Sequence, residues 1–152
     1  MVINDIREWI KATFVSHKEF CGYDAPKNSS TFGFSYNMNE QKSMQWHYMH
    51  RPKIVCVDGF EVSIQGGVGN YSTPKDFANE YEDMEIGFPS NFDDPEFADN
   101  DGQVCGYIPV DDLQKVITRH GGIDVKKSGI LELNYSNAKK YKRELKLERI
   151  LK

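Results

Sequence analysis

The chain has 152 residues and a net charge of −4, and its 39% hydrophobic and 12% aromatic content fits a globular protein and excludes a disordered one. No apolar run approaches the ~20 residues of a membrane span, and the three cysteines form no CxxC pair, which argues against zinc and a disulfide framework. No basic segment precedes the first apolar residues, so we expect no signal peptide and one cytoplasmic domain over residues 1–152.

The first third of the chain changes from a helical period to a period of two. Helical spacing opens the chain at Ile3, Ile6, Ile10 and Phe14. Asn4 or Asp5 can cap this predicted helix. Residues 17–30 have no period and are expected to form a connection. Alternating aromatic and apolar residues at 32–36 and 44–48 then predict strands.

The middle of the chain reads as a hairpin followed by a further strand. In KIVCVDGFEVSIQ, the Asp58-Gly59 pair favours a two-residue turn with positive φ at both positions. The second strand of this hairpin has one apolar face made of Phe60, Val62 and Ile64. YEDMEIGF predicts the next half-buried strand, with an apolar side made of Met84, Ile86 and Phe88. A long acidic loop follows it.

The last third predicts a strand, a helix, a short strand and a basic helix. VCGYI is the strand, and a helix begins after Pro109 and stops at Gly121-Gly122. GILEL is expected to be a final strand, and Ser136 to cap the last helix. The core-facing residues of that helix are Ala138, Tyr141, Leu145 and Ile150 or Leu151. The order predicts an α+β fold, an antiparallel sheet with the N-terminal helix and the two later helices on one face.

Motifs for metal binding and catalysis are weak. His47 and His50 point to opposite faces if HYMH is a strand, so we expect no metal there. FADNDG resembles a calcium loop, but Phe97 and Ile108 stand where it needs acids. His120 can interact as a cation with the carbonyls at a helix end. No nucleophile motif is present, and we therefore predict a binding protein without cofactor, not an enzyme.

The charges are segregated along the chain. Residues 76–112 carry twelve acids and no Lys or Arg, whereas residues 137–152 are mostly basic. Such asymmetry can mark a surface for a partner or for nucleic acid. It is also compatible with two regions that neutralise each other or are simply solvated, the more common case.

The stretch QGGVGNYSTPK, residues 65–75, is the best candidate for a ligand loop. It fits neither a P-loop nor a Rossmann fingerprint. Amides loosened by glycine can bind an anion, hydroxyls and a lysine can assist, and a tyrosine can stack on a base. Lys115 and Arg119, one helical turn apart, can face the same anion. The predicted ligand-binding residues are Gly66, Gly67, Tyr71, Ser72, Thr73, Lys75, Phe88, Tyr107, Lys115 and Arg119. The alternative is a β-bulge and hairpin turn.

Five short motifs, VSIQGG, NYSTPK, EIGFPS, CGYIPV and RHGGI, together resemble a widespread family of small phage and prophage proteins. The resemblance covers about residues 60–123. Two departures occur in its turn motif: Ser72-Thr73 stand where the family has Cys-Ser, and Lys75 stands where it has Arg. A lysine there would make a single-point contact in place of a bidentate one.

The resemblance implies a phage accessory protein that acts in the host-cell cytoplasm against host immunity. One expected activity is to sequester a cyclic nucleotide or an ADP-ribose-type signal, as a homo-oligomer with pockets completed across subunits. A first alternative is an acidic inhibitor that binds a host immune protein directly, as anti-CRISPR proteins do. A second is a nucleic-acid-binding accessory protein that uses the basic C-terminal helix.

Overall fold

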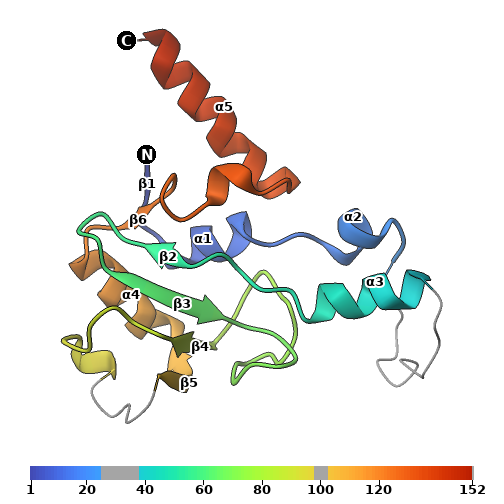
Figure 1. The fold of residues 1–152 in the computed structure, drawn as a ribbon, viewed down its shortest axis with the longest axis horizontal. Helices are drawn as coiled ribbons and strands as arrows, with labels where there is room; N and C mark the ends of the chain where they lie inside the picture. The colour runs from blue at the N-terminus through green and yellow to red at the C-terminus, as the bar shows by residue number, and fades with distance from the viewer. Residues whose placement is uncertain (25–37, 98–102, 152) are drawn as a thin grey trace.

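The computed structural model describes residues 1–24, 38–97 and 103–151, which form an α+β fold as predicted (Figure 1). A four-stranded antiparallel sheet has the order β2–β3–β4–β5. Its strands are β2 (Ile54–Val55), β3 (Glu61–Gln65), β4 (Asp83–Gly87) and β5 (Val104–Pro109). A second, two-stranded antiparallel sheet pairs β1 (Val2–Ile3) with β6 (Ile123–Asp124).

Two helices contribute to the main core beside the large sheet. The helices α1 (Ile6–Ala12) and α4 (Val110–Arg119) pack on each other and on one face of the large sheet. The alternation predicted for β3 is confirmed, since Phe60, Val62 and Ile64 are all buried in this core. Asp5 caps α1 by accepting a hydrogen bond from the Arg7 amide at 2.8 Å.

The end of α4 agrees with its glycine signal. Gly121 and Gly122 have φ values of 88° and 95°, a left-handed conformation that favours glycine. A Cβ at Gly122 would also lie 2.5 Å from a side-chain atom of Val2. The chain therefore leaves α4 directly into β6, which pairs with the N-terminal strand.

A smaller cluster lies beside the main core. The helices α2 (His17–Cys21) and α3 (Met38–His47) pack on each other, and the buried side chains of Val15, Trp46 and Phe77 form the centre. Arg51 is a buried residue at the edge of this smaller cluster, between it and the main core. The main-chain amide and carbonyl of Arg51 bond to both side-chain amide atoms of Gln65, at 2.7 and 2.8 Å.

The basic helix is α5 (Ser136–Leu151), preceded by the 3-10 turn η3 (Ile130–Glu132). Figure 1 shows α5 leaving the body and projecting away from the sheet. Its contacts with the body are made by its first turns, where Ala138 and Tyr141 are buried. The expectation that Ile150 or Leu151 faces the core is wrong, because they are 77% and 84% exposed.

Several predicted elements are corrected. Residues 44–48, predicted to form a strand, belong largely to helix α3. Trp46 is buried but Met44 and Tyr48 are exposed, and buried Ser43 lies three residues before Trp46, which is a helical spacing. GILEL forms η3, not a strand, with Gly129 in the left-handed region at φ 72°. Residues 17–21, expected to be a connection, form α2. The strand expected at 32–36 lies outside the described residues.

The hairpin at Asp58-Gly59 is confirmed, but its turn is longer than predicted. The Cys56 amide bonds to the Phe60 carbonyl at 2.8 Å, which leaves three residues in the turn. Only Gly59 among them has a positive φ, of 95°. This is a type of turn in which a glycine bulge, and not a second left-handed residue, restores the register.

Candidate functional site

The predicted ligand residues lie at the two opposite ends of β3. The loop at residues 66–75 leaves the C-terminal end of this strand and hydrogen-bonds to Tyr107 near the end of β5. Arg119 lies at the other end, because the ring of the next residue, His120, stacks on Phe60 with centroids 4.0 Å apart. The glycine loop and Arg119 therefore do not border a common site in the described structure.

Internal contacts set the shape of the glycine loop. A Cβ at Gly66 would lie 2.3–2.8 Å from the ring and hydroxyl atoms of Tyr81. The Gly67 amide donates to the Ser72 hydroxyl at 3.2 Å, and that hydroxyl donates to the Pro74 carbonyl at 2.9 Å. The small residues thus allow the loop to fold against its own neighbours.

The anion at this loop is one of the chain's own carboxylates. Both oxygens of Glu85 accept hydrogen bonds, from the Asn70 side-chain amide at 3.0 Å and from the Tyr71 amide at 2.9 Å. The Thr73 amide bonds to the Asp83 carbonyl at 3.3 Å. These amides could bind an external anion only if Glu85 and the Asp83 carbonyl moved away. Anion binding by this loop therefore stays a prediction.

Three of the predicted residues do come together, as a cation over two aromatic rings. The Lys75 Nζ atom lies 5.3 Å from the ring centroid of Tyr71 and 5.9 Å from that of Tyr107. The two rings are 5.9 Å apart, tilted by 52°, and are 56% and 48% exposed. Lys75 has no carboxylate partner among the described residues. We call Tyr71, Lys75 and Tyr107 the aromatic–lysine cluster.

A bulge in the sheet places Tyr107 in this cluster. Ile86 pairs with Cys105 but Met84 pairs with Ile108, so two residues of β5 oppose the single residue Glu85 of β4. Tyr107 is left-handed there, with φ 57°. Bulges of this kind re-aim side chains, and strained backbone of this type often occurs at functional sites. The adjacent Gly106 admits Tyr71, since a Cβ there would lie 2.4 Å from the Tyr71 Cβ.

Two other predicted residues lie outside the cluster. Phe88 follows β4 at its far end, with φ 51° and a ring that is 58% exposed, so it does not continue the buried side of Met84 and Ile86 as predicted. Lys115 lies exposed on α4, 3.5 Å from Asp112.

The end of α4 carries a network of ionic hydrogen bonds. Arg119 donates to both oxygens of Glu96 and to Asp94, and His120 contacts Asp94 at 2.8 Å and also Asp58. Asp94 is only 2% exposed. Because both ring nitrogens of His120 face carboxylate oxygens, both must carry protons for both bonds to form. The network ties the 3-10 turn η2 (Pro95–Phe97) and the β2–β3 hairpin to α4.

The titration of this network is shifted by its geometry. Burial works against the charged ring of His120, but its hydrogen bonds to Asp94 and Asp58 raise its pKa above the ordinary value. Against the effect of burial, bonds from the Phe60 amide and His120 lower the pKa of Asp58. Burial, together with the negative charges of Asp58 and Asp94, raises the pKa of the Cys56 thiol to about 12. The thiol therefore stays protonated and unreactive.

Other groups of chemical interest are buried or scattered. His17 Nε2 lies 2.8 Å from the Ser43 hydroxyl, a pairing that nucleophilic serines use, but both residues are buried. In the described ranges, no group of three or more His, Cys, Asp or Glu side chains is placed to hold a metal ion. Asp99, Asp101 and Gly102 of the predicted calcium-like loop lie outside those ranges. No described helix has the length and apolar character to cross a membrane.

Two cavities border α1, away from the predicted ligand residues. One of about 520 Å³ lies between α1 and the start of α5, and its charged lining residues are Asp5, Arg7, Glu8, Lys11 and Lys140. The other, about 240 Å³, is lined mainly by α1 and by residues 79–81. The aromatic–lysine cluster borders neither of these two cavities, and its two tyrosine rings are about half exposed.

Sequence reasoning found the three members of the cluster but missed the groups that organise it. Glu85, the bulge at Gly106 and the acidic partners of Arg119 depend on pairing between distant segments. Arg119 and His120, two residues that can carry positive charge directly before the paired glycines, were the signals of the network in the sequence. No protein-family model matches the chain, and neither a curated protein nor a solved structure is significantly similar to it.

Proposed function

We propose that this chain is a non-catalytic phage accessory protein that sequesters an anionic, nucleotide-type immune signal at the aromatic–lysine cluster. The observation that carries the proposal is the position of the Lys75 ammonium over two half-exposed tyrosine rings, without a carboxylate partner in the described chain. A base can stack on an exposed ring, and a phosphate beside it can pair with the ammonium.

The bulge supports a binding role for this surface. A regular β5 would leave Tyr107 in the strand alternation, whereas the left-handed residue brings its ring beside Tyr71. Such a conformation in a non-glycine residue costs roughly 1 kcal/mol or more. A cost of this size is more readily explained by a ligand contact than by packing, since both rings stay half exposed.

The exposure of the two tyrosine rings favours a second copy of the chain. Pockets for small ligands usually enclose most of the ligand's surface. The cluster borders neither of the two cavities at α1 and would cover one face of a nucleotide. We therefore propose a homo-oligomer in which a second chain covers the other face.

The alternative of an acidic protein inhibitor has less support. Several acids of the 76–112 block are paired within the chain: Asp76 with His47, Asp94 and Glu96 with Arg119, and Asp111 with Arg7. Each pairing reduces the free negative surface available to a basic effector.

Calorimetric titration of the full chain with ADP-ribose and with cyclic mono- and dinucleotides tests the proposal. We expect binding to at least one, weakened tenfold or more by Lys75→Ala and by Tyr107→Ala. Lys115→Ala is the matched control, because it removes a lysine elsewhere on the surface. Equal loss with the control, or no retention of any ligand at about 100 μM, would overturn the proposal. Conversion of the bound ligand, read by mass spectrometry, would contradict a non-catalytic role.

A further inference from the structure

The second half of α5 has no partner in the described structure. Tyr141 is the last buried residue of the helix, and its hydroxyl donates to Glu8 at 2.7 Å. Leu145 is half-buried, and every residue after it that the structure describes is exposed. Figure 1 shows this part of α5 projecting beyond the body. A helix that stands free over about two turns presents its surface to a partner or to solvent.

One side of α5 is predominantly cationic, with Ile150 as an apolar residue in the same arc. At 100° per residue, five basic side chains fall within an arc of about 120°. These residues are Lys139, Lys142, Arg143, Lys146 and Arg149. The two acids of the helix, Glu144 and Glu148, fall outside that arc. None of the five cations has an ion-pair partner in the part of the chain that the structure describes. We call these five residues the α5 basic face.

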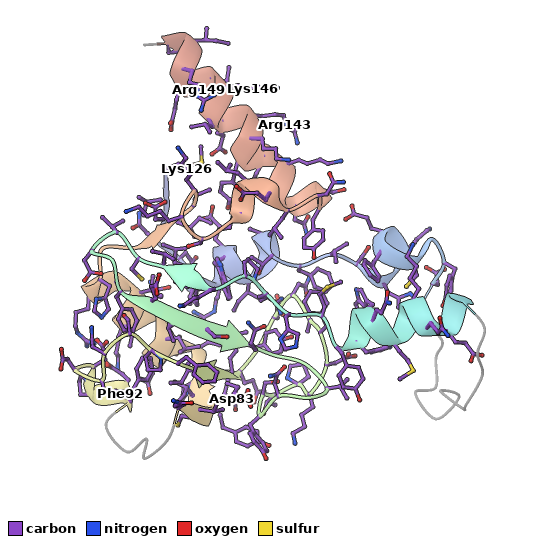
Figure 2. The ribbon with its side chains drawn as sticks, in the orientation of Figure 1. Asp83, Phe92, Lys126, Arg143, Lys146 and Arg149 are labelled. Carbon is purple, nitrogen blue, oxygen red and sulfur yellow. The ribbon has the colours of Figure 1, made fainter. Side chains whose placement is uncertain are left out.

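Part of the acidic 76–112 block lies at the opposite end of the molecule from this face. In Figure 1, α5 lies at one end of the molecule, and η2, β4 and β5 lie at the other. Figure 2 shows exposed Lys126 at the same end as Arg143, Lys146 and Arg149, while Asp83 lies at the opposite end. A chain with a net charge of −4 can therefore still present a positive end to a polyanion.

We propose that the α5 basic face binds the phosphate backbone of duplex DNA. A helix about 10–12 Å across fits a B-form major groove about 12 Å wide, and the cations extend over roughly 15 Å of its length. Duplex RNA has a major groove too narrow for such entry. This function is additional to the ligand capture proposed above and does not depend on the aromatic–lysine cluster.

The same helix is poorly suited to an anionic membrane. Of its exposed apolar residues, Ile150 lies within the basic face, and Leu147 and Leu151 lie between that face and the acids. Glu144 and Glu148 flank the other side, where they would repel anionic headgroups. Charge complementarity therefore favours a nucleic-acid backbone over a lipid surface.

Fluorescence anisotropy with a labelled 20-base-pair DNA duplex tests this surface in the full chain. If three or four phosphates are neutralised, affinity should fall roughly 40- to 150-fold between 50 and 200 mM salt. The triple variant K142Q/R143Q/K146Q should lose most of this binding and of its salt dependence. Lys75→Ala should keep both, which separates this proposal from the ligand site.

A second triple variant provides the matched control. K18Q/K53Q/K115Q removes the same charge from exposed lysines elsewhere and should bind DNA nearly as the unaltered chain does. Circular dichroism confirms that both variants are folded. Equal loss of binding in the two, no salt-dependent binding by the unaltered chain, or binding to vesicles of phosphatidylcholine and phosphatidylserine without binding to DNA would overturn the proposal.

Discussion

The guanidinium of Arg119 donates hydrogen bonds to both carboxylate oxygens of Glu96, at 2.9 and 2.8 Å. The same group also donates to buried Asp94. A residue expected to bind an external anion is thus occupied by two carboxylates of its own chain. Planar two-point pairing of this kind is specific to arginine and serves here to hold η2 against α4.

Replacing Arg119 by Ala should loosen η2 without unfolding the protein. The Phe97 amide bonds to the Asp94 carbonyl at 3.0 Å within this turn, and its exchange with solvent deuterium reports the opening of η2. We expect that exchange to accelerate tenfold or more. The matched control, Lys115→Ala on the same helix, should leave it unchanged. Unaltered exchange in the Arg119 variant would show that η2 is held by other contacts.

The contribution of His120 to stability should depend on pH with a defined sign. Its pKa is raised in the folded chain, so its contribution is complete below the ordinary histidine value of about 6.5 and is lost as pH rises through the raised value. We expect His120→Gln to cost about 2 kcal/mol of unfolding free energy near pH 6, because two charge-assisted bonds are lost, and clearly less at pH 9.

The ion pair between His120 and Asp58 also loses its contribution to stability at low pH, when Asp58 becomes protonated. Its pKa is lowered, so its contribution is present above the ordinary value of about 3.9 and is lost as pH falls through the lowered one. Urea unfolding at several pH values measures both effects. His50→Gln is the control, since His50 is exposed and outside the network. A cost for His120→Gln that stays constant from pH 6 to pH 9 would contradict a charged ring.

The fold was predictable where one element carries its own pattern. Val62 and Ile64 alternate on a strand with a buried face, and α4 is bounded by Pro109 and two glycines with left-handed φ. Helix α3 was predicted as a strand because three apolar residues happened to alternate. Its burial is decided by packing of Trp46 on Phe77, a contact between distant segments.

The candidate site was predictable only in part for the same reason. Tyr71 and Lys75 lie in one turn, so their proximity follows from the local sequence. Tyr107 joins them through a bulge that exists only once β4 and β5 are paired. The acids that neutralise Arg119 lie more than twenty residues away, and no spacing in the sequence points to them.

Arg51 should be one of the residues most sensitive to substitution. Its side chain is buried without a described carboxylate partner, and its guanidinium donates to the Ile10 and Ala78 carbonyls and to the Thr13 hydroxyl. The group also lies 4.6 Å from the ring centroid of Phe77. Burial lowers its pKa, but an arginine stays charged in proteins.

Replacing Arg51 by Met keeps most of the volume but leaves those acceptors unpaired. We therefore expect a loss of about 3 kcal/mol in unfolding free energy. Urea unfolding followed by tryptophan fluorescence measures it, since Trp9 and Trp46 are both buried. Arg7→Met, at an exposed ion pair, should change stability by less than about 0.5 kcal/mol. Similar small costs for both variants would mean that water replaces the guanidinium.

Gly66 and Gly87 provide a paired test of the loop that carries the aromatic–lysine cluster. A methyl group at Gly66 would lie 2.3 Å from the Tyr81 ring, whereas one at Gly87 would meet its nearest neighbour at 3.8 Å. We expect Gly66→Ala to cost about 2 kcal/mol, because overpacking displaces a buried ring, and Gly87→Ala to cost less than about 1 kcal/mol. Thermal unfolding of the two variants measures the difference.

The displaced Tyr81 ring should also disturb the cluster. The Tyr81 hydroxyl donates to the Asp76 carbonyl at 2.6 Å, directly after Lys75, so a shift of the ring moves the chain that carries the lysine. Gly66→Ala should therefore weaken nucleotide binding, and Gly87→Ala should not. If both variants bind equally well, the loop conformation at Gly66 has no part in ligand capture. If both are equally destabilised, the close contact with Tyr81 is not what requires glycine at residue 66.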